Sequence, residues 1–188
     1  RFSIWARTDA MAPYNSFGNG SAMRVSPVGW YFSTMQETLC WAEISARVSH
    51  NHPEGIKAAQ ATASAIFMAR GGQTKVRIRQ EIEAAFGYNL SQTLDSIRPG
   101  YQHDVTAAGS VPQAIIAFLE SDGFEDAIRN AVSLGGDSDT QGAIAGSIAE
   151  AAYGIPASIR TEALARLAPP MLGVVDRWES ALARRESV

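Results

Sequence analysis

The sequence has a single cysteine, no long apolar run and no excess of basic residues. Cys40 is the one cysteine in 188 residues, so a disulfide within the chain is excluded, which favours a reducing compartment. No apolar run approaches the roughly 20 residues of a membrane-spanning helix, and we expect no secretory signal before the domain. The net charge of −3, without a cluster of lysine or arginine, argues against nucleic acid as a partner. We therefore expect a cytoplasmic protein that binds neither membrane nor nucleic acid.

Convincing strand patterns are also absent, whereas helix signals recur along the whole chain. A hydrophobic content of 46% over 188 residues is enough for one well-packed core. Capping boxes begin at Thr34 and at Ser110, and Pro53 suits the first turn of a long helix. Further helices are expected after Thr74, Ser91, Gly123, Thr140, Pro156 and Pro170. These signals predict a single all-α domain over residues 1–188, in which residues 1–20 are irregular.

The run Gly-Gly-Asp-Ser-Asp-Thr at residues 135–140 places two carboxylates and a hydroxyl within four residues. Such oxygens are the ligands that Mg²⁺ and similar hard cations prefer. On a regular helix Asp137 and Thr140 share a face and Asp139 points nearly opposite. All three can therefore meet one ion only if Asp137 precedes the helix, which the two glycines permit. The same spacing also suits a simple Asp N-cap followed by a solvated Asp.

The segment after this run is rich in glycine and alanine and has helical spacing of its isoleucines. Small side chains let neighbouring helices approach closely on all sides. We therefore expect this helix to lie at the centre of the fold.

A glycine-rich segment near the start of the chain, residues 17–24 and called the glycine loop below, is a second candidate site. Glycines bracket Asn19, and Ser21 can act as an N-cap, so successive backbone N–H groups from Asn19 to Ser21 could point at a phosphate or a sugar. The pair Asn19-Gly20 is equally a common turn signal. Arg24, at the end of this segment, can bind an anion or form an ion pair with an acidic side chain on the surface.

Two histidines and one tyrosine complete the candidates. His50 and His52 lie two residues apart, but the other soft donors, His103 and Cys40, lack the spacing of a zinc site. A histidine at a helix entrance is more often a capping or packing residue than a ligand. Tyr101 lies in a loop and can either stack on a base or pack on the core.

Together, Gly18–Arg24, Ser49–Glu54 and Gly135–Thr140 resemble motifs of the ADP-ribosylglycohydrolase family, which includes the dinitrogenase reductase-activating glycohydrolases. The resemblance covers nearly the whole chain in the right order, and the last motif is the most specific. It implies a compact, single-domain orthogonal bundle of helices. It also implies hydrolysis of the bond between ADP-ribose and a modified protein side chain or small acceptor, at a centre of two Mg²⁺ or Mn²⁺ ions.

The resemblance also implies roles for individual residues. Asp137 and Asp139 become the catalytic residues, and together with Thr140 they become metal ligands. The resemblance also implies five residues that bind the ribose, the diphosphate or the adenine of the substrate: Asn19, Gly20, Ser21, His50 and Tyr101. Tyr101 is the stacking candidate for the adenine, and His50 lies beside the substrate.

The start of the chain departs from the pattern of this family. The resemblance implies an earlier helix with a Gly-Asp motif and a Thr-Asp-Asp-Thr segment that donates the other half of the metal ligands. Upstream of the glycine loop, Asp9 is the only acidic residue. We therefore expect an N-terminally incomplete member, in which those ligands have been lost, are supplied by another polypeptide or are naturally absent.

Three functions remain open on these grounds. The first is a hydrolase completed by an upstream segment, the second is a module that binds ADP-ribose without cleaving it, and the third is a crystallin-like structural protein. A missing helix would also leave apolar surface uncovered, so self-association of the isolated chain is expected.

Overall fold

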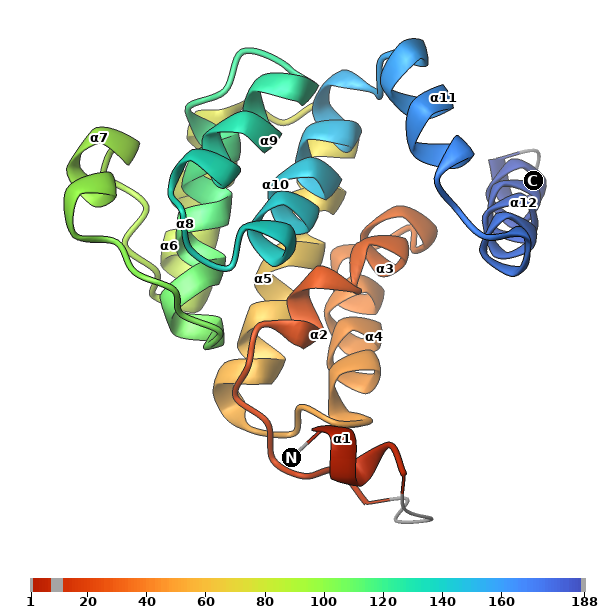
Figure 1. Cartoon of the computed structure of the whole chain (residues 1–188), viewed down its shortest axis with the longest axis horizontal. Coiled ribbons are helices and arrows are strands. Elements are labelled where there is room, and N and C mark those ends of the chain that lie inside the picture. The colour runs from red at the N-terminus through yellow and green to blue at the C-terminus, as the bar shows by residue number, and fades with distance from the viewer. Residues whose placement is uncertain (1, 8–11, 187–188) are drawn as a thin grey trace. The chain divides into compact units, whose positions relative to one another are not determined.

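The computed structural model describes residues 2–7 and 12–186 (Figure 1). These residues form helices joined by loops, and the β pairing among them is confined to one antiparallel bridge between Gly18 and Thr106. The expected all-α fold class is therefore confirmed. The chain divides into two compact units, residues 1–153 and residues 154–188.

Ten helices are described in the first unit. They are α1 (Phe2–Trp5), α2 (Gly20–Met23), α3 (Ser26–Tyr31), α4 (Met35–Arg47), α5 (Pro53–Arg70), α6 (Lys75–Phe86), α7 (Leu94–Ile97), α8 (Ala107–Leu119), α9 (Phe124–Ser133) and α10 (Ser138–Tyr153). A 3₁₀ turn, η1 (Arg98–Gly100), follows α7. The stretch that we expected to be irregular thus contains the short helix α1.

The second unit contains α11 (Ala157–Ala165) and α12 (Pro169–Glu186). An ion pair between Arg160 and Glu179 joins these two helices. In the chain segments that the structure describes, 2–7 and 12–186, we find no helix with the length and apolarity needed to cross a membrane.

Local capping sets several helix boundaries where the sequence predicts them. The Thr34 hydroxyl accepts a hydrogen bond from the Glu37 backbone N–H, and the Glu37 carboxylate accepts one from the Thr34 backbone, as in a capping box. Thr74 caps α6, and Gly87 ends it with a left-handed φ of 66°. These contacts span only a few residues, which is why the sequence pattern was sufficient.

The expected capping box at Ser110 was wrong. Helix α8 begins at Ala107, and its N-cap is Thr106, whose hydroxyl accepts from the Gly109 N–H at 3.0 Å. Ser110 lies inside the helix and donates to the Thr106 carbonyl at 2.6 Å. The bridge to Gly18 holds Thr106 in the extended conformation that an N-cap needs.

The expected N-cap at Ser21 was also wrong, because α2 begins one residue earlier at Gly20. Ser21 is instead a buried residue of that short helix. Its hydroxyl donates to the Gly55 carbonyl at 2.7 Å and so ties α2 to α5.

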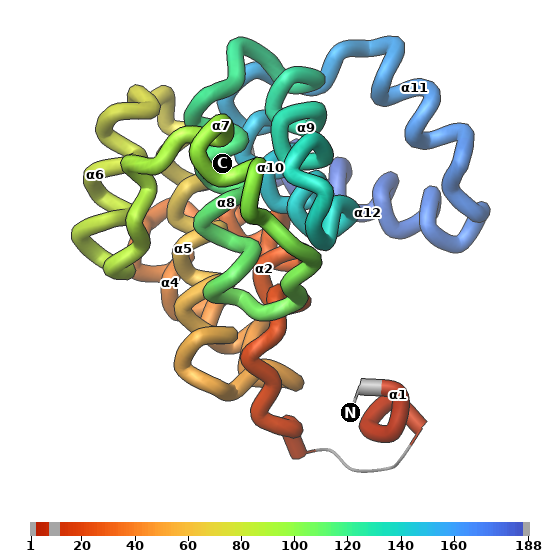
Figure 2. The backbone as a smooth tube through the Cα atoms, turned by 60° about the vertical axis from the view of Figure 1, so that its left-hand side comes forward, coloured from red at the N-terminus to blue at the C-terminus, as the bar shows by residue number. Residues whose placement is uncertain are grey.

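Two helices, α5 and α10, share the centre of the first unit (Figures 1 and 2). Helix α5 packs against α2, α3, α4, α6, α8 and α10, and α10 packs against α2, α3, α5, α8 and α9. Both helices bury mainly small side chains, which permits close approach. The expected central position of α10 is thus shared with a helix that the sequence analysis did not single out.

Candidate functional site

Asn19 joins the glycine loop to the start of α10. Its side-chain Nδ2 donates to Asp137 Oδ2 at 2.6 Å and to Ser110 Oγ at 2.9 Å. The Asn19 side chain is almost fully buried. On the other side, its backbone N–H donates to the Val105 carbonyl at 3.0 Å. Two of the three sequence motifs therefore meet at one place, although they are 118 positions apart.

The loop before α10 has the backbone that a shared cation site requires. Gly135 has a φ of 75°, in the left-handed region that glycine adopts most readily. Helix α10 begins at Ser138, so Asp137 precedes it. The Asp137 carbonyl accepts the Gln141 N–H at 2.9 Å, which continues the first helical turn. Asp137 is thus on the loop side, as convergence of the ligands requires.

Asp137, at the end of this loop, and Asp139, in the first turn of α10, lie within hydrogen-bonding reach of each other. A hydrogen bond with the Asp137 side chain is the largest cause that holds the pKa of the exposed Asp139 below its ordinary value. Backbone N–H groups of Thr140 and of Asp139 itself lower this pKa further. The Thr140 hydroxyl is buried and faces the Met23 sulfur at 3.6 Å.

These donors fit a hard cation in part. Two neighbouring carboxylates and a threonine hydroxyl offer oxygen ligands of the kind that Mg²⁺ takes. In residues 2–7 and 12–186, however, no group of three or more His, Cys, Asp or Glu side chains could hold a metal ion. Mg²⁺ prefers octahedral coordination, so its remaining ligands would come from water, from a ligand or from elsewhere in the protein. Asp9 lies outside the described residues.

His50, from the third motif, packs against the glycine loop at Gly20. It is only 5% exposed, and its Nδ1 lies 2.8 Å from the Ser49 hydroxyl. A Cβ added at Gly20 would lie 3.1 Å from the His50 Nε2, so the glycine lets the loop backbone rest on the imidazole ring. Burial first, and then the positive charge of Arg24, lower the pKa of His50 to about 4.

This low pKa makes the stability of the protein depend on pH. The unfolded chain binds a proton at His50 near pH 6.5, whereas the folded chain does so only near pH 4. We expect the free energy of unfolding to fall as the pH is lowered from 6.5 to 4 and to lose this contribution in the variant His50→Asn. Urea titrations at a series of pH values measure this; equal slopes in the two proteins would contradict it.

His52 has a structural role. Its Nδ1 accepts the Glu54 backbone N–H at 3.1 Å and so caps α5. Its ring also meets the edge of Phe17. The capping alternative considered for the two histidines is therefore confirmed for this one.

Tyr101 packs beside the Asp137 loop. Its hydroxyl donates to the Gly109 carbonyl at 2.7 Å and accepts from the Gln141 Nε2 at 2.6 Å. A Cβ at Gly136 would lie 2.4 Å from the Tyr101 ring, so this glycine is required for the ring to sit there. Burial, followed by the negative charge of Asp104, raises the pKa of Tyr101 to about 12. Tyr101 thus packs against the loop that contains Asp137 and supports it.

We expect Tyr101→Phe to cost about 1 to 3 kcal/mol, because it leaves the buried amide of Gln141 without its acceptor. Tyr88 offers a matched control: its buried hydroxyl has no hydrogen-bond partner among the described residues. Tyr88→Phe should therefore be neutral or stabilising. Urea unfolding of the two variants checks this, and equal losses in both would show that the Tyr101 hydroxyl is not the cause.

Three residues of this region were missed in the sequence analysis. The sequence pattern predicts Ser110 only as a cap, yet its hydroxyl oxygen accepts the second hydrogen bond of the Asn19 amide. Gln141, fully buried in a helix of small residues, is the partner of Tyr101, and a lone amide in such a segment was a usable signal. Asp104 accepts the Thr106 N–H at 2.7 Å and positions the start of α8.

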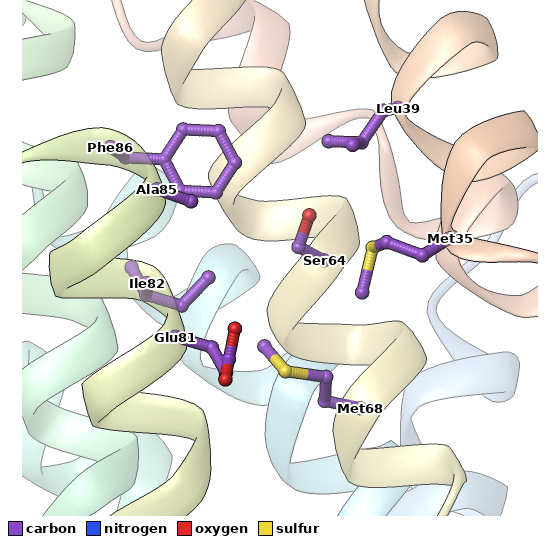
Figure 3. A pocket seen from close by; sticks show the side chains of 8 residues that line it. All are labelled: Met35, Leu39, Ser64, Met68, Glu81, Ile82, Ala85 and Phe86. Atoms are coloured by element: carbon purple, nitrogen blue, oxygen red, sulfur yellow. The ribbon is translucent and has the colours of Figure 1, made fainter.

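A pocket of about 90 Å³ lies elsewhere, between α4, α5 and α6 (Figure 3). Its lining residues are Met35, Leu39, Ser64, Met68, Glu81, Ile82, Ala85 and Phe86. None of them is a predicted site residue, and most are apolar. None of the residues predicted to bind a metal ion or ADP-ribose therefore lines this pocket.

Comparison with known families and solved structures shows what the whole chain is similar to. Residues 2–187 match the model of a family described as ADP-ribosylglycohydrolase. A solved structure described as an ADP-ribosylglycohydrolase-related protein complex is similar with a TM-score of 0.72 and 27% sequence identity. The similarity covers 97% of this chain and 66% of that chain.

Several curated proteins are similar in sequence. An ADP-ribosylhydrolase ARH3 of Gallus gallus is 28% identical over 193 residues, which cover 77% of this chain and 53% of the relative. An ADP-ribosyl-dinitrogen reductase glycohydrolase of Rhodospirillum rubrum is 27% identical over 149 residues, 77% of this chain and 49% of the relative. An ADP-ribosylarginine hydrolase of Pseudomonas putida is 31% identical over 150 residues, 73% of this chain and 39% of the relative. The chain spans about half the length of the first two of these relatives.

Proposed function

The chain belongs to the ADP-ribosylglycohydrolase family, and on that premise we propose that it hydrolyses the glycosidic bond between ADP-ribose and a modified protein side chain or small acceptor. The single observation that supports this best is the hydrogen bond from Asn19 to Asp137 at 2.6 Å. It joins the loop suited to ribose and phosphate oxygens to the loop suited to a cation. Binding and chemistry would then share one site.

Members of this family are generally metal-dependent. We propose that Asp137, Asp139 and Thr140 hold Mg²⁺ or Mn²⁺ as part of a centre of two ions. When bound, such ions polarise oxygen atoms of the substrate and lower the pKa of a coordinated water. Asp137 and Asp139 would serve as the catalytic residues of this chain. Asn19 keeps the Asp137 carboxylate in place through its buried amide.

The ADP-ribose would lie along the glycine loop. We propose that Asn19, Gly20 and Ser21 line its ribose and diphosphate, with the backbone of Ser21 as the contact because its hydroxyl is engaged by Gly55. His50, whose Nε2 faces Gly20, would lie beside the same part of the substrate. Tyr101 would offer its ring to the adenine while its hydroxyl holds Gly109 and Gln141.

The test is the Mg²⁺-dependent release of ADP-ribose. ADP-ribosyl-arginine is a suitable first substrate, because one relative is named as an ADP-ribosylarginine hydrolase. An ADP-ribosylated protein is the second. We expect release with Mg²⁺ or Mn²⁺ and none with excess chelator. Release that is unchanged by chelator would contradict the metal-dependent mechanism.

A second candidate is a module that binds ADP-ribose without cleaving it. It is favoured by the fact that no third acidic or histidine ligand joins the two aspartates within residues 2–7 and 12–186. Calorimetry would then show binding of ADP-ribose at a one-to-one ratio without turnover. A crystallin-like structural protein would bind neither the nucleotide nor the metal.

We propose a cytoplasmic location and partners limited to ADP-ribosylated proteins or ADP-ribosyl small molecules. Cys40 is free and exposed, which suits a reducing compartment. The net charge of −3 supports the exclusion of nucleic acid.

We further propose that the isolated chain self-associates. Trp41, Ile44 and Val48, at helical spacing along and just past α4, are 47%, 48% and 58% exposed. Exposed apolar stripes of this kind tend to be covered by a partner. Light scattering is expected to show an average molar mass that rises with protein concentration. The rise should be smaller for the variant Trp41→Glu. A concentration-independent monomer would contradict the proposal.

A further inference from the structure

Three polar groups form a chain behind the glycine loop. Arg24 Nη2 donates to the Ser49 Oγ at 2.8 Å, and that oxygen lies 2.8 Å from His50 Nδ1. Arg24 also reaches the Ser45 carbonyl at 3.4 Å, which anchors the guanidinium on the end of α4. Ser49 is only 1% exposed. The arginine, which follows α2, is thus connected through a buried hydroxyl to the imidazole.

The donors and acceptors of the Arg24–Ser49–His50 hydrogen bonds favour one tautomer of His50. A guanidinium can only donate, so the Ser49 oxygen must accept from Arg24. A hydroxyl has one proton, and directing it to Nδ1 satisfies both Ser49 and the ring. Nε2 then carries the ring hydrogen. The opposite tautomer would make Ser49 accept from both neighbours and turn its own proton away from both.

The surroundings also keep this ring neutral. The positive charge of Arg24 acts on His50, and among the described residues the Tyr14 ring meets the imidazole edge at 6.1 Å between centroids. A nearby positive charge and burial both disfavour a second proton on the ring. The Nε2 atom, which carries the single ring hydrogen in this tautomer, faces Gly20 and lies 3.7 Å from the Cβ position of Gly18.

We propose that Arg24 and Ser49 are positioning residues that fix His50 as a neutral imidazole with its Nε2–H directed at the glycine loop. The donor is suited to a ribose or diphosphate oxygen lying on that loop, and this choice of ligand rests on the proposed function. A neutral donor of fixed direction recognises an oxygen acceptor at every pH where the ring stays unprotonated. The tautomer itself does not depend on whether ADP-ribose is cleaved.

NMR of the full chain with ¹⁵N-labelled histidine tests the tautomer directly. The nitrogen shifts of His50 should show Nε2–H, with no titration between pH 8 and about pH 5. His52 and His103 provide reference signals in the same spectrum. A His50 signal from the Nδ1–H tautomer, or one that titrates near its ordinary pKa, would overturn the inference.

Substitutions separate positioning from simple packing. Ser49→Ala should give a mixture of tautomers, and Arg24→Met should raise the apparent pKa of His50. Arg24→Lys, which keeps a positive donor, should restore the low pKa in part. Ser45→Ala is the matched control, because Arg24 contacts only the Ser45 backbone and the spectrum should not change. If Ser49→Ala fails to fold, as judged by circular dichroism, the two Arg24 variants carry the test; an unchanged His50 in Arg24→Met would overturn it.

Calorimetry with ADP-ribose tests the ligand part separately. We expect the affinity of Ser49→Ala to fall about tenfold, the loss of one well-directed hydrogen bond. Unchanged affinity in this variant would overturn the assignment of the donor to ADP-ribose. Absence of hydrolysis in the unmodified protein would instead count against the proposed function alone, since it leaves the tautomer and the affinity measurements intact.

Discussion

Asp139→Ala is expected to lower the metal-dependent release of ADP-ribose at least about 100-fold. Even residues that only orient metal ligands typically cost 10- to 100-fold when they are removed, so a ligand should cost more. Asp139 is exposed and lies beside Asp137, so its loss removes one of the two carboxylates without opening the core. The measurement is the initial rate of release at several Mg²⁺ concentrations.

The matched control for this experiment is Asp126→Ala. Asp126 is likewise an exposed aspartate in the first turn of a helix, α9, and it accepts the Asp122 backbone N–H at 2.9 Å. Its rate should stay close to that of the unmodified protein. Unchanged release in Asp139→Ala would reject the assignment of this residue to the metal. A rate that recovers at high Mg²⁺ would identify the defect as weakened binding of the ion.

The second large effect is expected at Gly29, in α3. A Cβ there would lie 2.6 Å from the Ile66 Cβ and 2.9 Å from the Ala63 carbonyl oxygen of α5. Neither atom is the end of a flexible side chain, and Ile66 is fully buried. Gly29→Ala should therefore force α3 away from α5 and lower the free energy of unfolding by about 2 to 3 kcal/mol.

Gly142→Ala is the control, because it also replaces a helical glycine. The nearest atom to its Cβ position is a Val132 methyl group at 4.0 Å, which is ordinary contact. Alanine should stabilise α10 there by about 0.5 to 1 kcal/mol through its helix propensity. Urea unfolding of both variants measures the pair. A Gly29→Ala protein as stable as the parent would show that α3 and α5 can separate at little cost.

The helices of this protein were largely predictable from the sequence. Thr34, Thr74 and Gly87 mark the helix ends where the pattern put them, because a cap forms its hydrogen bonds within a few residues. Ser110 shows the limit of such signals. Thr106, four residues earlier, is an equally suitable cap, and the bridge to Gly18 selects it.

The candidate residues were also predictable, but their arrangement was not. The sequence by itself determined the all-α class and the oxygen-rich run that ends at Thr140, because both depend on residue types at short spacing. Only the tertiary structure decided that Asn19 holds Asp137, that His50 faces Gly20 and that Tyr101 buttresses the acidic loop. These contacts join residues far apart in the chain, and helix periodicity carries no information about which loops the packing of α5 and α10 brings together.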